Sequence, residues 1–210
     1  MNPNRLGIFM LLALLLGGDG AEPLQAQILY GPGQDSRLWI EGRSNINGFE
    51  CGATVYDLEA SVGGDEEGND QVAGRLAIAV DGFACGDGRM DRDLKKALQV
   101  ERFPQIHFVF HRGQLIEPGS QGERPYKGRI WGQLTVAGVS RPIECLVEGE
   151  VLADGSVRVY GGVAVRMSDY QIKPPTRLWG LVKVRDQLTV RFDFLLRPVA
   201  QPNSTLPPGN

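Results

Sequence analysis

Regular alternation of apolar and less apolar residues is the feature that most limits how this chain can fold. In residues 105–117, Ile106, Phe108 and Phe110 share one parity, and less apolar residues separate them. Successive side chains of a β-strand point to opposite faces, so this pattern predicts a strand with one apolar face. The same rhythm recurs between Gly, Asp, Asn and Pro residues and predicts eight strands, over residues 36–43, 53–61, 71–82, 105–117, 128–137, 141–152, 156–167 and 187–197.

The apolar faces of these strands must be hidden from water. Short connections indicate an antiparallel sheet, which hides one face by closing into a barrel or by packing against a second sheet. A barrel also removes the unpaired edges of an open sheet. The opposite faces carry charged residues such as Glu144, Arg191 and Asp193, which would be costly against lipid. The pattern therefore predicts an all-β domain with its apolar faces inward, and it leaves a barrel and a sandwich as alternatives.

One short helix is predicted within this series of strands, at roughly residues 91–99. Met90, Leu94 and Leu98 form an apolar stripe at helical spacing. Acidic residues begin the segment and lysines follow, in the order that the helix dipole favours. Pro104 ends the helical pattern. Because the stripe is only three turns long, we expect it to cover one small apolar patch, as a lid on one end of the strand domain.

The first 26 residues have the pattern of a secretory signal peptide. Arg5 precedes an apolar run, residues 6–16, that is too short to span a bilayer of about 30 Å, and small and polar residues follow it. We prefer cleavage after Ala26, with Gly20 and Ala21 as alternative sites. The chain then divides into a signal peptide (1–26), a lead-in (27–35), a strand domain (36–198) and a disordered, Pro- and Ser-rich tail (199–210). We expect a periplasmic or secreted protein with no transmembrane segment after signal removal.

Three cysteines in an exported chain fit one disulfide and one free thiol. We favour a bond between Cys51 and Cys85, which would stabilise the fold by about 4 kcal/mol on a chain-entropy model. Cys145 lies on the apolar parity of its strand and fits a buried free thiol. The alternative is that all three cysteines are reduced.

The sequence contains no arrangement of residues typical of a catalytic, metal or nucleic-acid site. His107 and His111 are the only histidines, and four residues apart on a strand they lie about 13 Å from each other, too far to chelate one metal ion. Nucleophile-elbow, phosphate-loop and dinucleotide motifs are absent, and a net charge of −3 with mixed signs argues against a nucleic-acid partner. We therefore predict no enzyme activity, cofactor or metal. Trp39, Trp131 and Trp179 are expected at the rim or on the outside, against the helix.

Three stretches of the chain follow one another in an order that points to one protein family. They are "MDRDLKKALQVERFPQIHFVF" from residue 90, "YKGRIWGQLTVAGVSRPIECLVEG" from residue 126, and "VRMSDYQI" from residue 165 with "DQLTVRFDFLL" from residue 186. In these stretches the chain resembles the YceI-like proteins, secreted bacterial barrels that bind polyisoprenoids and other long amphiphiles. It departs from many members by lacking a histidine-rich first strand and by inserting "KPPTRLWGLVK" before the last strand. The resemblance implies an eight-stranded antiparallel lipocalin-like barrel and carries no catalytic residues.

In such a barrel the apolar parity would form the wall of a ligand cavity. The predicted lining consists of Leu38, Ile40, Ile78, Val80, Ile106, Phe108, Phe110, Leu134, Val136, Val163, Val165, Phe192 and Phe194. We expect non-enzymatic binding or transport of a long-chain amphiphile, such as a polyisoprenoid, an isoprenoid quinone or a fatty-acid-like lipid. Two alternatives remain: a barrel with a filled core that acts in protein interaction or stress protection, and an enzyme acting on an apolar substrate. The oligomeric state stays open, with a homodimer as one option.

Overall fold

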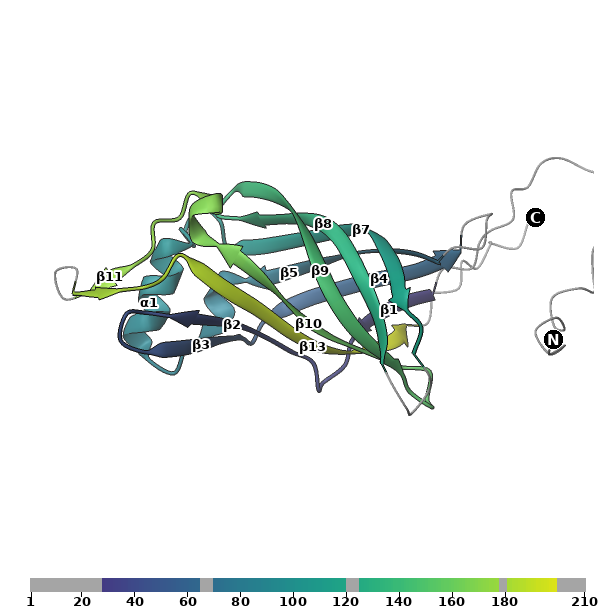
Figure 1. The fold of residues 1–210 in the computed structure, drawn as a ribbon. Coiled ribbons are helices and arrows are strands. Elements are labelled where there is room, and N and C mark those ends of the chain that lie inside the picture. The colour runs from purple at the N-terminus through teal and green to yellow at the C-terminus, as the bar shows by residue number, and fades with distance from the viewer. Residues whose placement is uncertain (1–27, 65–69, 120–124, 178–180, 200–210) are drawn as a thin grey trace, which may run out of the picture.

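The structure is a computed structural model that describes residues 28–64, 70–119, 125–177 and 181–199. The predicted signal peptide, nearly all of the predicted tail and Trp179 lie outside these residues. One α-helix and a set of β-strands make up most of the described chain (Figure 1). The strands are β1 (Ile28–Pro32), β2 (Arg37–Arg43), β3 (Gly48–Ala53), β4 (Tyr56–Gly64), β5 (Asp70–Ala79), β6 (Phe83–Ala84), β7 (Gln105–Glu117), β8 (Tyr126–Val136), β9 (Val139–Val151), β10 (Val157–Arg166), β11 (Thr176–Arg177), β12 (Val182–Lys183) and β13 (Gln187–Val199). The helix is α1 (Gly88–Ala97), and two 3-10 turns are η1 (Val80–Gly82) and η2 (Met167–Tyr170).

Eight antiparallel strands close into a barrel, which confirms the predicted fold class. The ring runs β1-β4-β5-β7-β8-β9-β10-β13, and pairing of β1 with β13 closes it. The second half of β13 pairs with β1, and its first half pairs with β2, which continues to β3 and β6. Thus β1 and β2 occupy the same edge of β13 at opposite ends of the barrel (Figure 1). Closure leaves no exposed edge in the ring, as expected for a stable β-domain in water.

Two wall strands lie where the sequence predicts none. β1 falls in the segment treated as a lead-in, and β3 falls in the gap between the first two predicted strands. The sequence of β1, ILYGP, is short and ends at a proline, and that of β3, GFECGA, contains two glycines. Both features weaken the usual strand signal, because Gly and Pro are depleted in strands. Pairing with neighbouring strands, β13 and β4 for β1, and β2 and β6 for β3, rather than intrinsic β-propensity, therefore fixes these two elements.

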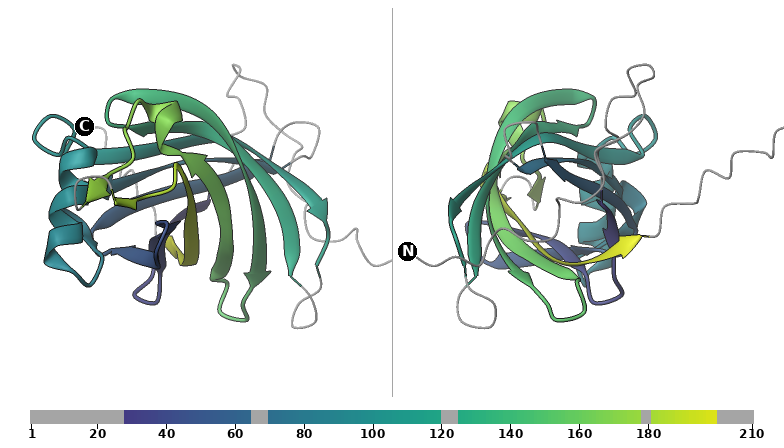
Figure 2. Two further views of the ribbon diagram at one scale, coloured as in Figure 1. Left: turned by 60° about the vertical axis from the view of Figure 1, so that its left-hand side comes forward. Right: turned by 90° about the vertical axis from the view of Figure 1, so that its right-hand side faces the viewer.

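The helix α1 lies across one end of the barrel (Figures 1 and 2). It begins earlier than predicted because the Asp87 side chain accepts hydrogen bonds from the backbone N–H groups of Arg89 and Met90, the usual N-cap arrangement. It ends earlier because Leu98 is its C-cap and Gln99 has a positive φ of 55°. Leu98 is nevertheless 7% exposed and packs into the barrel core with Met90 and Leu94 beside it. The predicted stripe therefore faces the barrel.

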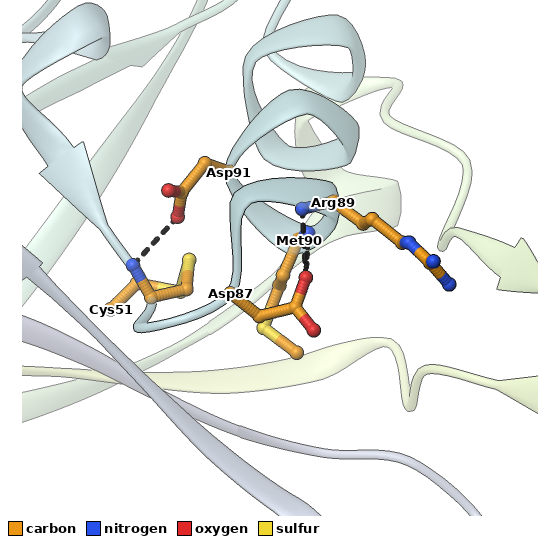
Figure 3. Close-up of a disulfide and its surroundings, with 6 residues drawn as sticks. Cys51, Asp87, Arg89, Met90 and Asp91 are labelled. Carbon is orange, nitrogen blue, oxygen red and sulfur yellow. Dashed lines mark hydrogen bonds between the residues drawn. A yellow bond between two sulfur atoms is a disulfide. The ribbon is translucent and has the colours of Figure 1, made fainter.

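A disulfide fastens the start of α1 to the wall. Cys51 of β3 is bonded to Cys85, just before the helix, as predicted (Figure 3). The backbone N–H of Cys85 donates a hydrogen bond of 2.7 Å to Asp91 on the first turn of α1. Cys145 is free and buried, also as predicted. Cys85 is therefore held to β3 by the disulfide and to the first turn of α1 by the hydrogen bond.

Charged side chains cover the outside of the barrel wall. Ion pairs join neighbouring strands, for example Arg75 with Glu59 at 2.9 Å. Trp39 lies under the Arg37 guanidinium, 4.6 Å from the ring centroid, and donates to Glu41. Trp131 likewise packs against arginines and donates to Glu144. These two tryptophans are on the outside as predicted, but the partners that the structure gives them are charged wall residues.

Candidate functional site

The inward side chains of the barrel surround a cavity of about 1370 Å³. Every residue of the predicted lining except Val80 borders this cavity. Neighbouring strands bring these residues into facing rows, because pairs such as Leu76 with Phe108 and Leu134 with Phe108 lie opposite each other in the ladder. The residues that strand parity predicts therefore lie on one continuous inner surface of the barrel.

Val80 is the one predicted lining residue that the structure places elsewhere. Strand β5 ends at Ala79, and Val80 opens the 3-10 turn η1, where its N–H donates to the carbonyl of Pro104. It is 1% exposed and belongs to the packed core. The prediction for Val80 is wrong because the alternating pattern continues past the residue at which the strand turns.

Glycines opposite phenylalanines leave the lumen open. Gly42 faces Phe49, Gly74 faces Phe110, and Gly161 faces Phe192 across the ladder. A Cβ added at Gly42 would lie 2.7 Å from Phe49 Cε2, and one at Gly161 would lie 3.1 Å from Phe192 Cζ. Each ring therefore reaches the place where a Cβ would stand on the glycine opposite it, as in aromatic rescue of strand glycines. A ring that lies along the wall takes less of the central space than one that points across it.

The cavity has further lining residues that the sequence analysis did not select. Some follow the same strand parity and were within reach of that rule, namely Leu58, Leu76, Ile130, Ile143, Met167, Leu188 and Val190. Others come from elements without a strand pattern. Tyr30 and Phe49 lie on the unpredicted strands β1 and β3, and Tyr170 lies on the 3-10 turn η2. No periodic signal marks those positions, so tertiary structure alone brings them to the lumen.

The cavity extends between both ends of the barrel. At the helix end Met90, Leu94 and Leu98 border it, as do the exposed residues Ile46 and Arg89. At the far end its border includes Leu115 and Val151, which are also exposed. The helix therefore stands where the lid was predicted, and closure of the cavity by the helix stays a prediction.

The buried titratable groups along the lumen are neutral at neutral pH. Burial raises the pKa of the Cys145 thiol to about 11, with Glu144 nearby adding to the effect. Burial also raises the pKa of the Tyr170 hydroxyl to about 12. Both groups border the cavity. The lumen beside these two side chains is therefore suited to an uncharged, apolar occupant, since an ion there would lose its hydration without a partner.

Neither histidine takes part in this site. His107 and His111 are exposed on the wall. Within the described ranges, no group of three His, Cys, Asp or Glu side chains is placed to hold a metal ion. In the same ranges no helix is long and apolar enough to cross a membrane.

A closed antiparallel barrel with an apolar through-cavity and a helix across one end defines a lipocalin-like class of binding fold. The YceI-like domain model matches residues 36–196. The chain therefore belongs to the YceI-like family.

Several solved structures have a similar fold. BcnA of Burkholderia cenocepacia has a TM-score of 0.61 and 16% identity over 77% of this chain and 96% of that protein. A polyisoprenoid binding domain from Saccharophagus degradans has a TM-score of 0.58 and 12% identity over 83% of this chain and 99% of that domain. The YceI protein of Campylobacter jejuni has a TM-score of 0.54 and 17% identity, covering 72% and 85% respectively. No curated protein sequence matches the chain significantly.

Proposed function

We propose that this protein binds and carries one long apolar chain in its lumen, without chemical conversion. The ligand class is a polyisoprenoid, an isoprenoid quinone or a fatty-acid-like lipid. The observation that carries the proposal is the cavity of about 1370 Å³ between the two barrel ends. This volume exceeds the roughly 300–1,000 Å³ of an ordinary small-molecule pocket. A barrel with a filled core would present no such space.

The dimensions of the wall favour a long ligand. Strands β7, β9 and β13 each have 13 residues. At about 3.3 Å per residue and a tilt of about 40°, such strands form a wall roughly 30 Å tall. The hydrocarbon core of a bilayer is also about 30 Å thick and is filled by two acyl chains end to end. The lumen is therefore long enough for a chain well beyond the length of one acyl tail.

Burial of hydrocarbon supplies the binding energy. Each CH₂ group removed from water contributes about 0.8 kcal/mol, so fifteen of them give a gross gain of about 12 kcal/mol. Loss of translational and conformational freedom opposes this gain. The two buried titratable groups that border the lumen, Cys145 and Tyr170, are neutral at neutral pH. A polar headgroup would therefore remain near an open end of the barrel, where exposed residues border the cavity.

Two further observations support this proposal. A similar fold is found in a polyisoprenoid binding domain from Saccharophagus degradans. The Cys51–Cys85 disulfide suits an oxidising compartment, in agreement with the expectation of a periplasmic or secreted protein. A carrier in such a compartment would shield an isoprenoid or lipid chain from water.

Native mass spectrometry of protein isolated from its native host tests the proposal. We expect one bound molecule per chain, released by organic extraction and identified from the extract. Protein from the native host that carries no added mass, and that takes up no added long-chain isoprenoid alcohol, would refute the proposal.

A pair of variants on strand β10 links ligand binding to the lumen. Val163 borders the cavity, and its neighbour Ala164 is exposed on the outside. Val163→Asn places an amide in the lumen and should lower ligand retention at least tenfold, because the polar group needs water that the ligand excludes. Ala164→Asn should retain the ligand as the unchanged protein does. Equal retention by both variants would show that the ligand does not occupy this cavity.

A further inference from the structure

Two hairpin tips are joined at the helix end of the barrel. One is the turn between β2 and β3, and the other is the hairpin of β11 and β12 (Figures 1 and 2). The Asn45 side-chain amide donates to the carbonyl of Leu181 at 2.8 Å, and the N–H of Lys183 donates to the Asn45 side chain at 2.8 Å. The N–H of Asn45 also donates to the carbonyl of Lys183. Three hydrogen bonds therefore hold the turn between β2 and β3 against Leu181 and strand β12.

The two joined tips hold two large apolar side chains in water. Leu181 is 72% exposed and Ile46 is 64% exposed, the highest values among the exposed large hydrophobic residues of the described chain. The exposure of Ile46 is built into its turn, because the Ser44 hydroxyl accepts from the N–H groups of Ile46 and Asn47. These bonds fix the backbone of the turn with Ile46 at its tip.

Basic residues surround the two tips. The sequence from residue 171 to 185 has four basic residues and no acidic residue, in a chain with a net charge of −3. Arg43 joins this group, since the N–H of Arg185 donates to its carbonyl at 2.8 Å. Among the described side chains, Arg43, Lys183 and Arg185 form no ion pair, in contrast to the paired arginines of the wall.

The nearest carboxylates are engaged in local hydrogen bonds. Asp186 accepts from the N–H and hydroxyl of Ser168, and these bonds lower the pKa of its carboxyl. At the start of α1, Asp87 caps the helix and Asp91 accepts from the N–H of Cys85. Hydrogen bonding leaves these carboxylates negative, but residues 171–186 carry four basic residues and one acidic residue, so the net charge of this segment is positive.

We propose that this end of the barrel docks on the surface of an anionic phospholipid membrane. Ile46 and Leu181 insert among the headgroups, while Arg43, Lys183 and Arg185 contact lipid phosphates. Apolar tips flanked by basic residues are the chemistry that peripheral proteins use at a membrane interface. A stable protein interface needs about 800 Å² from each partner, which two protruding side chains do not supply. A bilayer surface adapts to protruding tips and needs no matching shape.

Docking also orients the cavity. Ile46, Val182 and Val184 border the cavity as well as the docking end, so its opening would face the bilayer. The idea that this orientation lets lipid pass between the bilayer and the cavity rests on the proposed function. The docking on the membrane does not. Binding to vesicles and retention of a bound lipid are therefore measured separately on the same variants.

Vesicle flotation tests the docking, with the chain from Gln27 onward because the apolar run at residues 6–16 would itself bind lipid. The unchanged chain should float with vesicles that contain about one third phosphatidylglycerol, and far less with pure phosphatidylcholine. Ile46→Ser with Leu181→Ser should weaken partitioning at least tenfold, since each side chain loses its apolar burial. Lys183→Glu with Arg185→Glu should weaken partitioning at least tenfold and remove most of its dependence on salt.

The matched control lies at the opposite end of the barrel. Leu115 and Val151 are also exposed and border the cavity there, so Leu115→Ser with Val151→Ser should float as the unchanged chain does. The proposal is overturned if the unchanged chain stays with the unbound fraction, or if the far-end variant loses as much binding as the tip variant. Self-association that the tip variant abolishes, without vesicle binding, would assign the tips to an interface between copies instead. Tip variants that lose vesicle binding and keep bound lipid would support docking independently of the carried ligand.

Discussion

Replacing Gly42 with alanine tests why the lumen is open. Gly42 is buried on the inner face of β2, directly opposite Phe49 of β3. An alanine Cβ would lie 2.7 Å from Phe49 Cε2 and 2.8 Å from Leu188 Cδ2. The three atoms nearest to it all belong to side chains, so we expect the backbone to stay in register. The Phe49 ring must then swing off the wall and into the cavity that it borders.

The expected cost is set by overpacking and by the space available to the ring. Added methyl groups in a packed core cost about 1–3 kcal/mol. Since the ring can move into an empty lumen, we expect about 1 kcal/mol of lost stability, at the lower end of that range. The displaced ring also occupies volume that the ligand uses. A loss of one or two buried CH₂ contacts would weaken ligand binding roughly four- to fifteenfold.

Denaturant unfolding and ligand titration of two variants measure these effects. The control is Gly52→Ala on the neighbouring strand, because a Cβ at Gly52 would meet no atom within 4 Å. Alanine there should leave the stability unchanged or slightly raised, since it lowers the entropy of the unfolded chain. If Gly42→Ala and Gly52→Ala have equal stability and bind ligand equally, the phenylalanine rings do not depend on the glycines and the reasoning fails.

Three further predictions follow from the disulfide, the buried thiol and the helix. Replacing both Cys51 and Cys85 with alanine should lower the free energy of unfolding by about 4 kcal/mol, and urea titration under oxidising conditions that shows no loss would refute this. Cys145 should react with iodoacetamide at pH 7–8 at roughly one hundredth of the rate of an ordinary thiol, because burial raises its pKa to about 11; mass spectrometry should show faster labelling as the pH rises or the protein unfolds, and rapid labelling of the native protein would contradict it. Leu94→Asp should lower the melting temperature and speed ligand loss, since Leu94 packs against the core and borders the cavity; unchanged melting and retention would count against a lid.

Long strands in which apolar and polar residues alternate regularly were predictable, because burial of one face determines which of their residues are apolar. The predicted range 105–117 coincides with β7, whose inner face carries Ile106, Phe108 and Phe110. Beyond Phe110 the register shifts at a bulge, and inward positions change parity, so that Leu115 borders the cavity. The position of a one-residue bulge cannot be predicted from the alternating pattern of one strand alone. The direction of the side chains after the bulge depends on how the strand pairs with its partner.

The lining of the lumen was predictable, but the volume that its side chains leave unfilled was not. Parity places Phe110 and Phe192 on the inner face whether the barrel is hollow or filled. The volume that remains depends on where each ring lies, and that depends on the cross-strand partners Gly74 and Gly161. Register between strands far apart in the sequence is a tertiary property. A chain with the same inward residues paired with bulkier partners would fill its own core.

A ligand must pass through an end of this barrel rather than through its wall. The ring of strands is closed, and separating two long neighbours such as β7 and β8 would break a ladder that runs from His107 to Glu117. Each net hydrogen bond contributes about 1 kcal/mol, so such an opening costs far more than displacing the half-buried side chains Met90 and Leu94 at the helix end. The disulfide holds the start of α1 to β3, which confines that displacement to the later turns of the helix. The rate of ligand exchange should therefore respond to Leu94→Asp and not to changes on the outside of the wall.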